Sequence, residues 1–200
     1  MNAAEHLLGE DALARHGART ALVCAERTLT YRELAADMAR AANTLRALGV
    51  QPGERVLLLL RDTPEFVATW LGAVHAGAVA VGLNSKLAEA DYRHMIADSQ
   101  ARLLIADEGL LPVLGSLAAE LEGERRMVRS ADWRGQSARA APHAEARAVR
   151  LEDPAFWLFS SGTTGRPKGI VHGHKSVLAA GQAQREVLGL GPGDRVFATS

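Results

Sequence analysis

The stretch RVLLLLRDTPEFVATWLGAVHAGAVAVGL, residues 55–83, contains the pattern that decides the fold. Residues 55–60 include an unbroken run of Val and Leu, which predicts a strand buried on both faces. Thr63-Pro64-Glu65 then supplies an N-cap, a proline at the first helical position and an acid in the first turn, so a helix should begin there and continue to about residue 76. The apolar residues 78–83 predict a second strand. A strand, a helix and a strand at this spacing indicate a right-handed crossover between parallel strands.

The same alternation continues on both sides of this stretch. Upstream, Thr30 and Glu33 have the spacing of a capping box, apolar residues follow at helical intervals, and Gly49 stands where a C-terminal glycine belongs. The predicted fold class is therefore α/β, a largely parallel sheet flanked by helices. Further elements are expected over residues 3–16 (helix), 19–25 and 27–29 (strands), 88–99 (helix) and 102–106 (strand).

The sequence divides into three segments. Residues 1–121 have the pattern of an α/β lobe. Residues 122–150 are rich in Arg and Ala and show little periodicity, so they are expected to form an irregular connection. Residues 151–200 read as a phosphate-loop segment that is truncated at its C-terminal end. This last segment is expected to contain a strand at 155–160, an extended stretch at 170–172, a helix at 175–188 and the beginning of a strand at 195–199.

The composition favours a globular protein and argues against a protein that binds nucleic acid or a membrane. The 200 residues are 48% hydrophobic and 23% charged, as in a globular protein with a buried core. Lys plus Arg equals Asp plus Glu, 23 against 23, so the chain has no net field that would attract nucleic acid or an anionic membrane. There is no basic stretch followed by an apolar run at the N-terminus, and the apolar runs are too short to span a bilayer. The expected location is the cytoplasm.

The segment richest in chemistry is Ser160-Ser161-Gly162-Thr163-Thr164-Gly165-Arg166-Pro167-Lys168-Gly169. Its glycines allow the backbone to curve around an anion with the N–H groups turned inward. Its hydroxyls add donors, and Lys168 brings a positive charge. The segment therefore predicts a polyphosphate-binding loop. It is not a Walker A loop, because its glycines are three apart and its lysine precedes a glycine.

Two simpler interpretations compete with the phosphate loop and its surroundings. The loop could be a surface turn rich in small polar residues, although few turns combine so many hydroxyls and glycines with a proline and a lysine. His172 and His174 stand two apart on an expected strand and would share a face. A metal site needs more ligands, and none lies at suitable spacing nearby, so no metal-binding residue is predicted.

The loop resembles the phosphate-loop signature of the adenylate-forming superfamily, which includes acyl-CoA synthetases, AMP-dependent synthetases and ligases. The resemblance extends upstream through Leu29-Thr30-Tyr31-Arg32-Glu33-Leu34, Pro52-Gly53-Glu54-Arg55-Val56 and Thr63-Pro64-Glu65-Phe66, in order and spacing. Residues 153–159 with the loop are most similar to the benzoate-CoA ligase branch. The resemblance covers essentially the whole chain and implies that residues 1–200 are the N-terminal portion of the AMP-binding domain.

The resemblance implies a two-step reaction. A carboxylate attacks the α-phosphorus of ATP to give acyl-AMP and pyrophosphate, and the thiol of coenzyme A then displaces AMP. ATP, Mg²⁺ and coenzyme A would be the co-substrates. The substrate would be a small carboxylic acid, and an aromatic acid such as a benzoate is favoured. No catalytic residue is expected in this segment, because the family's catalytic lysine lies beyond Ser200. The residues expected to bind the nucleotide phosphates are Ser160, Ser161, Gly162, Thr163, Thr164, Gly165, Arg166 and Lys168.

Two rival functions remain open at the level of sequence. One is an adenylation domain that loads a carrier protein, and the other is a catalytically inactive module that binds a nucleotide or a partner. Because the resemblance places the adenine, ribose and magnesium sites later in the family's chain, these 200 residues alone are expected to lack ligase activity.

Overall fold

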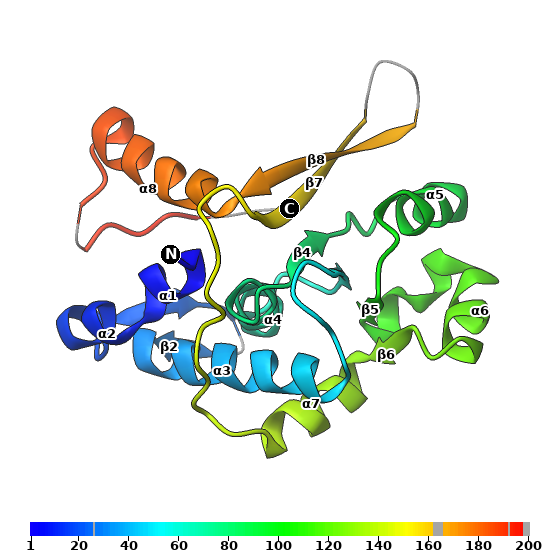
Figure 1. Cartoon of the computed structure of the whole chain (residues 1–200), viewed down its shortest axis with the longest axis horizontal. Helices are drawn as coiled ribbons and strands as arrows, with labels where there is room; N and C mark the ends of the chain where they lie inside the picture. Colours follow the sequence, from blue (N-terminus) through cyan, green and yellow to red (C-terminus); the bar gives the residue numbers. More distant parts are fainter. Residues whose placement is uncertain (26, 162–165, 192, 198–200) are drawn as a thin grey trace.

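The computed structural model describes residues 1–25, 27–161, 166–191 and 193–197. Within these residues the main sheet has six strands in the order β6-β5-β3-β4-β7-β8 (Figure 1). All neighbouring pairs are parallel except β7 and β8. The predicted α/β class and largely parallel sheet are confirmed. The strands are β3 (Arg55–Leu59), β4 (Val79–Gly82), β5 (Leu103–Ala106), β6 (Met127–Arg129), β7 (Pro154–Ser161) and β8 (Pro167–Gly173).

Helices cover both faces of the sheet. Val56 and Leu58 of β3 join one hydrophobic core, and Leu57 and Leu59 join the other, because successive side chains of a strand point to opposite faces. The first core is closed by α1 (Ala3–Leu8), α3 (Tyr31–Ala47), α4 (Pro64–His75) and α7 (Ser130–Arg139). The second is closed by α5 (Glu89–Ser99), the 3-10 helix η1 (Glu108–Leu114) and α6 (Leu117–Gly123).

The predicted helix starts are confirmed at α3 and α4. Thr30 Oγ1 accepts a hydrogen bond from the N–H of Glu33 at 3.2 Å, and Glu33 Oε2 accepts one from the N–H of Thr30 at 2.8 Å. These reciprocal bonds make the capping box that begins α3. Gly49 follows the helix with φ +78°, a conformation that favours glycine. Pro64 occupies the first position of α4.

The N-terminal region differs in one detail from the prediction. The single helix expected over residues 3–16 is divided at Gly9 into α1 and α2 (Glu10–His16). Gly9 is extended, with ψ 179°, which ends α1 and reorients α2. The two short strands are confirmed as β1 (Thr20–Val23) and β2 (Thr28–Thr30), an antiparallel pair separate from the main sheet.

The expectation of an irregular connection over residues 122–150 is wrong for most of that segment. β6 pairs in parallel with β5, and α7 follows it directly. The irregular parts are the short turn at residues 124–126 and residues 140–150, here called the strap. β6 spans three residues and α7 buries only Ser130 and Trp133, so neither gives a readable periodic pattern.

The C-terminal region contains the predicted helix, α8 (His174–Leu188). The strand expected over residues 195–199 is not present in its described part, residues 195–197, which have no regular structure; residues 198 and 199 lie outside the described residues. Among the helices of the described ranges, none has the length and apolar character needed to cross a membrane.

Candidate phosphate-binding site

The residues on either side of the predicted phosphate loop form the antiparallel hairpin of β7 and β8 (Figure 1). The cross-strand pairs nearest the loop are Ser160 with Lys168 and Ser161 with Pro167. β7 runs parallel to β4, with Val81 opposite Trp157. The predicted loop therefore follows the carboxyl end of a strand that belongs to the parallel part of the sheet. Open α/β sheets bind their ligands at this edge.

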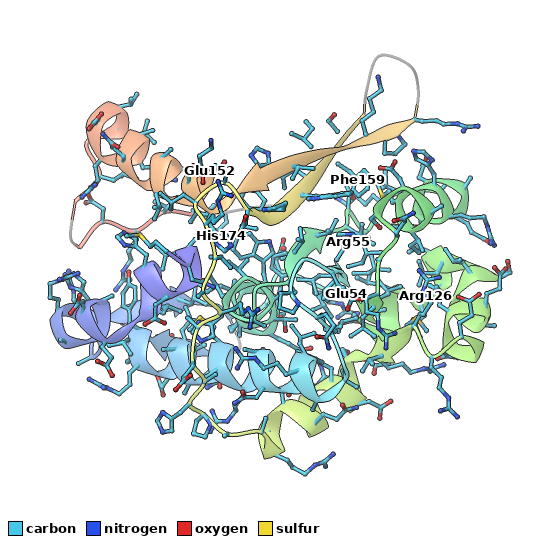
Figure 2. All side chains as sticks on the ribbon, viewed as in Figure 1. Glu54, Arg55, Arg126, Glu152, Phe159 and His174 are labelled. Carbon is cyan, nitrogen blue, oxygen red and sulfur yellow. The ribbon has the colours of Figure 1, made fainter. Side chains whose placement is uncertain are left out.

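The hairpin has one packed face and one exposed face. Trp157 and Phe159 of β7 pack against the second core, on the side of α5 (Figure 2 labels Phe159). Ser160, the next residue, points to the other face and is exposed, as is its cross-strand partner Lys168. Lys168 forms no ion pair with any side chain that the structure describes. One hydroxyl and one ammonium therefore stand opposite each other on the exposed face, beside the predicted loop.

The structure describes part of the predicted binding set. Ser160, Arg166 and Lys168 are exposed, and the backbone of Ser161 completes β7. The N–H groups expected to turn toward an anion stay a prediction, because four predicted binding residues lie outside the described residues. These are Gly162, Thr163, Thr164 and Gly165.

Sequence reasoning missed the role of α5 at this hairpin. His94 of α5 lies with Nε2 3.0 Å from the carbonyl oxygen of Pro167. A Cβ on Gly169 would lie 2.9 Å from Cε3 of Trp157, so only glycine fits the close approach there. His94 and Pro167 are 73 residues apart, and no local pattern in the sequence connects them.

A second group of charges lies at the same edge of the sheet, after β3 and β5. The guanidinium of Arg61 is 3.6 Å from Asp107, and that of Arg134 is 3.2 Å from Glu65. Burial raises the pKa of Glu65, and the bond from Arg134 partly opposes this shift. Each of these two arginines faces a carboxylate, so the group has little charge left for an anion. Lys168, by contrast, is exposed and faces no carboxylate among the described side chains.

Further arginines gather at the opposite, amino edge of the sheet, where Figure 2 labels Arg55 and Arg126. Arg55 donates to the carbonyl of Gln100 at 3.1 Å, and Arg126 donates to that of Ala101 at 2.7 Å. They therefore satisfy carbonyl groups at and just beyond the C-terminus of α5. These cations have a structural role and stand apart from the hairpin.

The two histidines after the loop do not share a strand face, contrary to the prediction. His172 lies on β8 and stacks on Phe156, with ring centroids 4.6 Å apart and planes at 6°. His174 is the first residue of α8; it is buried, and its Nδ1 accepts a hydrogen bond from the N–H of Ala3 at 3.1 Å. Burial lowers the pKa of His174. Across the described ranges, no group of three or more His, Cys, Asp or Glu is placed to hold a metal ion.

A largely parallel sheet with helices on both faces and a glycine- and hydroxyl-rich segment after a strand defines an α/β protein of the kind that binds phosphate-bearing ligands. The chain belongs to the family of AMP-binding enzymes, whose model matches residues 9–200. The resemblance to the adenylate-forming superfamily, and within it to the benzoate-CoA ligase branch, is thereby confirmed.

Individual relatives agree with this family. The chain is 46% identical to the 3-hydroxybenzoate–CoA/4-hydroxybenzoate–CoA ligase of Thauera aromatica, over 100% of this chain and 40% of that protein. Its fold matches the crystal structure of the anthranilate CoA ligase AuaEII in complex with anthranoyl-AMP, with a TM-score of 0.87 and 34% identity over 95% of this chain and 37% of that one. A benzoate CoA ligase from Burkholderia xenovorans gives a TM-score of 0.82 at 33% identity, covering 95% and 38% of the two chains. The chain thus spans about two fifths of the length of these relatives.

Proposed function

We propose that this chain is the N-terminal portion of an ATP-dependent ligase that joins an aromatic carboxylic acid, such as a benzoate, to coenzyme A. The similarity to hydroxybenzoate, benzoate and anthranilate CoA ligases supports both the reaction and the substrate class. The observation that carries the proposal for this chain's own residues is the pairing of Ser160 with Lys168 on the exposed face of the hairpin.

In this proposal the loop and its flanks hold the β- and γ-phosphates of ATP. When a carboxylate attacks the α-phosphorus, the bond to the bridging oxygen breaks and pyrophosphate leaves with the electron pair. Negative charge therefore grows on the group that Lys168 and the loop donors contact. Donors fixed in place before the reaction stabilise such charge more than flexible ones do, because they need no reorganisation. The β-hairpin supplies this fixed geometry for Ser160 and Lys168.

Mg²⁺ is part of the proposal for the longer enzyme, but the described residues include no cluster suited to it. Hard oxygen ligands would be needed, and the family resemblance places the magnesium-binding Glu later than residue 200. Lys168 and the loop would therefore act on the phosphates beside the ion. We likewise propose the division into an α/β lobe over residues 1–121, a connection and a phosphate-loop segment over 151–200. Because β6 and α7 are regular elements, residues 122–139 join the lobe and the connection is reduced to the strap.

ATP–pyrophosphate exchange with benzoate and hydroxybenzoates tests the first step in the longer protein. We expect Lys168→Ala to lower the exchange rate about 100-fold, as when one donor to a developing anion is removed. Lys175→Ala is the matched control, because Lys175 is also exposed but lies on α8. Equal activity of the Lys168→Ala variant and the wild type would refute the assigned role.

The same assay separates the rival functions. Exchange followed by acyl-CoA formation supports the ligase, whereas transfer only to a phosphopantetheinyl carrier protein supports the adenylation domain. No exchange in the longer protein with any aromatic acid supports the inactive module. The 200-residue chain alone is expected to show no exchange, and activity in this chain would contradict that part of the proposal.

A further inference from the structure

Helix α5 contacts the first residues of β8 on the packed face of the hairpin. His94 lies on this helix, half-buried, with Nε2 3.0 Å from the carbonyl oxygen of Pro167. Pro167 is buried and is the first residue of β8. The ring nitrogen donates and the carbonyl accepts, so the bond joins a core helix to the peptide that directly precedes Lys168.

The position of this peptide determines where the Lys168 side chain begins. The proline ring restricts φ of Pro167 to about −65°. A hydrogen bond to the carbonyl of Pro167 restricts ψ of the same residue, because rotation about ψ would swing the oxygen away from the imidazole. Together the ring and the bond fix both backbone dihedrals on the N-terminal side of Lys168.

The C-terminal side of Lys168 is fixed by a close approach. A Cβ on Gly169 would lie 2.9 Å from Cε3 of Trp157 and 3.5 Å from Oδ2 of Asp98. Asp98 is one helical turn after His94, so the same face of α5 reaches both peptides that flank the lysine. Side chains alternate along β8, and Lys168 therefore points to the exposed face while its two neighbours meet α5 and Trp157.

We propose that His94 is a positioning residue for Lys168, holding the exit of the phosphate loop by its bond to the carbonyl of Pro167. This inference rests on the proposed function for its catalytic consequence, since a lysine aligned before the reaction stabilises a departing pyrophosphate better than a mobile one. The structural part of the inference concerns only this chain. His94 touches no substrate in this arrangement and acts through Lys168.

The variants His94→Ala and His94→Gln test the inference. Alanine removes the donor, whereas the Gln amide retains one on a side chain of similar reach. His143→Ala is the matched control, because His143 is exposed and uses its backbone carbonyl, not its ring, to accept a bond from Asn43. The first readout is amide hydrogen exchange of the chain, followed for peptides that cover β8 and, as a reference, β3.

We expect His94→Ala to accelerate exchange in β8 about fivefold to tenfold, the effect of losing one hydrogen bond, with β3 unchanged. His94→Gln and His143→Ala should exchange as the wild type does. Unchanged exchange in β8 of the His94→Ala variant would overturn the inference. Equal acceleration in the Ala and Gln variants would also overturn it, because packing and not the bond would then be responsible.

The second readout is ATP–pyrophosphate exchange by the longer protein. His94→Ala should lower kcat about fivefold to tenfold with little change in KM for the carboxylic acid, and Gln should recover most of the loss. Faster hydrogen exchange in β8 of the His94→Ala variant together with an unchanged kcat would overturn the positioning role. If the wild-type longer protein shows no exchange at all, the proposed function fails, and the hydrogen-exchange result alone decides whether His94 orders β8.

Discussion

At the scale of single residues, Gly72 decides how closely α3 and α4 approach. A Cβ at this position would lie 2.6 Å from Cβ of Ala41, 2.9 Å from the carbonyl oxygen of Met38 and 3.0 Å from the nitrogen of Ala42. Two of these atoms belong to the backbone of α3, which cannot move aside cheaply. The absence of a side chain at residue 72 is therefore what allows the two helices to pack at this distance.

We expect Gly72→Ala to lower the free energy of unfolding by up to about 2 kcal/mol. Forcing a methyl group into a packed contact costs about 1–3 kcal/mol, and the gain of about 1 kcal/mol in helix propensity offsets part of this cost. Gly181→Ala on α8 is the matched control, because a Cβ there meets nothing within 4 Å. That variant should gain up to about 1 kcal/mol. Urea unfolding followed by circular dichroism measures both, and a stabilised Gly72→Ala variant would contradict the argument.

The residues of the candidate site were predictable where the signal is local. Ser160 and Lys168 could be singled out because hydroxyls, glycines and a lysine crowd into one short segment. His94 could not be singled out, since its partner is 73 positions away and the bond depends on how α5 meets β8. Local composition therefore singles out a candidate binding loop, whereas the contacts that hold its flanks follow only from the packed structure.

At the scale of elements, α7 depends on one buried side chain. Trp133 is 1% exposed, and its indole N–H donates to Oγ1 of Thr69 on α4 at 3.0 Å. The only other buried residue of this helix is Ser130. Most of the apolar contact that holds α7 against α3 and α4 thus comes from a single ring.

We expect Trp133→Ala to lower the free energy of unfolding by about 3–5 kcal/mol, the cost of a large cavity in a core. Thr69→Val should cost about 1–3 kcal/mol, because it leaves the buried indole N–H without its acceptor. Arg139→Ala, on the exposed last turn of the same helix, should change stability by less than about 0.5 kcal/mol. Urea midpoints compare the three variants, and a loss for Trp133→Ala no larger than that for Arg139→Ala would refute the dependence on this ring.

Helices and strands were predictable from the sequence where several local signals, such as a cap, apolar periodicity and a terminal glycine, coincide. α3 has a capping box, periodic apolar residues and a terminal glycine, and its predicted start agrees with the structure. β6 is only three residues long, and α7 is a polar helix with one large buried side chain. The sequence of this segment therefore suggested an irregular connection. Tertiary contact with β5 and α4, which no local pattern records, stabilises both.

At the scale of the whole molecule, the strap leads from α7 toward β7 without regular structure, and it crosses in front of α3 and passes beside α4 (Figure 1). Side chains of the helices hold it in place. Asn43 donates to the carbonyl of His143 at 2.9 Å, and a ring nitrogen of His75, Nε2, lies 3.1 Å from the carbonyl of Ala144. The backbone of His75 also accepts a bond from the N–H of Arg147 at 2.9 Å. The strap therefore ties the phosphate-loop hairpin to the first core through a buried histidine.

The buried histidine of this link, His75, should make the free energy of unfolding decrease in mild acid. Burial lowers the pKa of His75, an effect that the bond to Ala144 and the Glu5 carboxylate, 3.8 Å away, oppose, while Arg46 adds to it. The unfolded imidazole, which titrates near its ordinary pKa of about 6.5, then binds more protons than the folded one below neutrality. The contribution of neutral, buried His75 to the free energy of unfolding is therefore present above the unfolded pKa and is lost as the pH decreases below it. We expect the free energy of unfolding to decrease between about pH 7.5 and about pH 5.5.

The contribution of His75 can be separated from that of other histidines by urea unfolding at both pH values. His75→Gln keeps an amide donor for the Ala144 carbonyl but does not titrate, so its stability should decrease less between the two pH values than that of the wild type. A smaller decrease should remain, because burial also lowers the pKa of His174. His143→Ala, which removes an exposed imidazole, should retain the wild-type dependence. If His75→Gln loses as much stability as the wild type between the two pH values, the burial of His75 does not account for the decrease in acid.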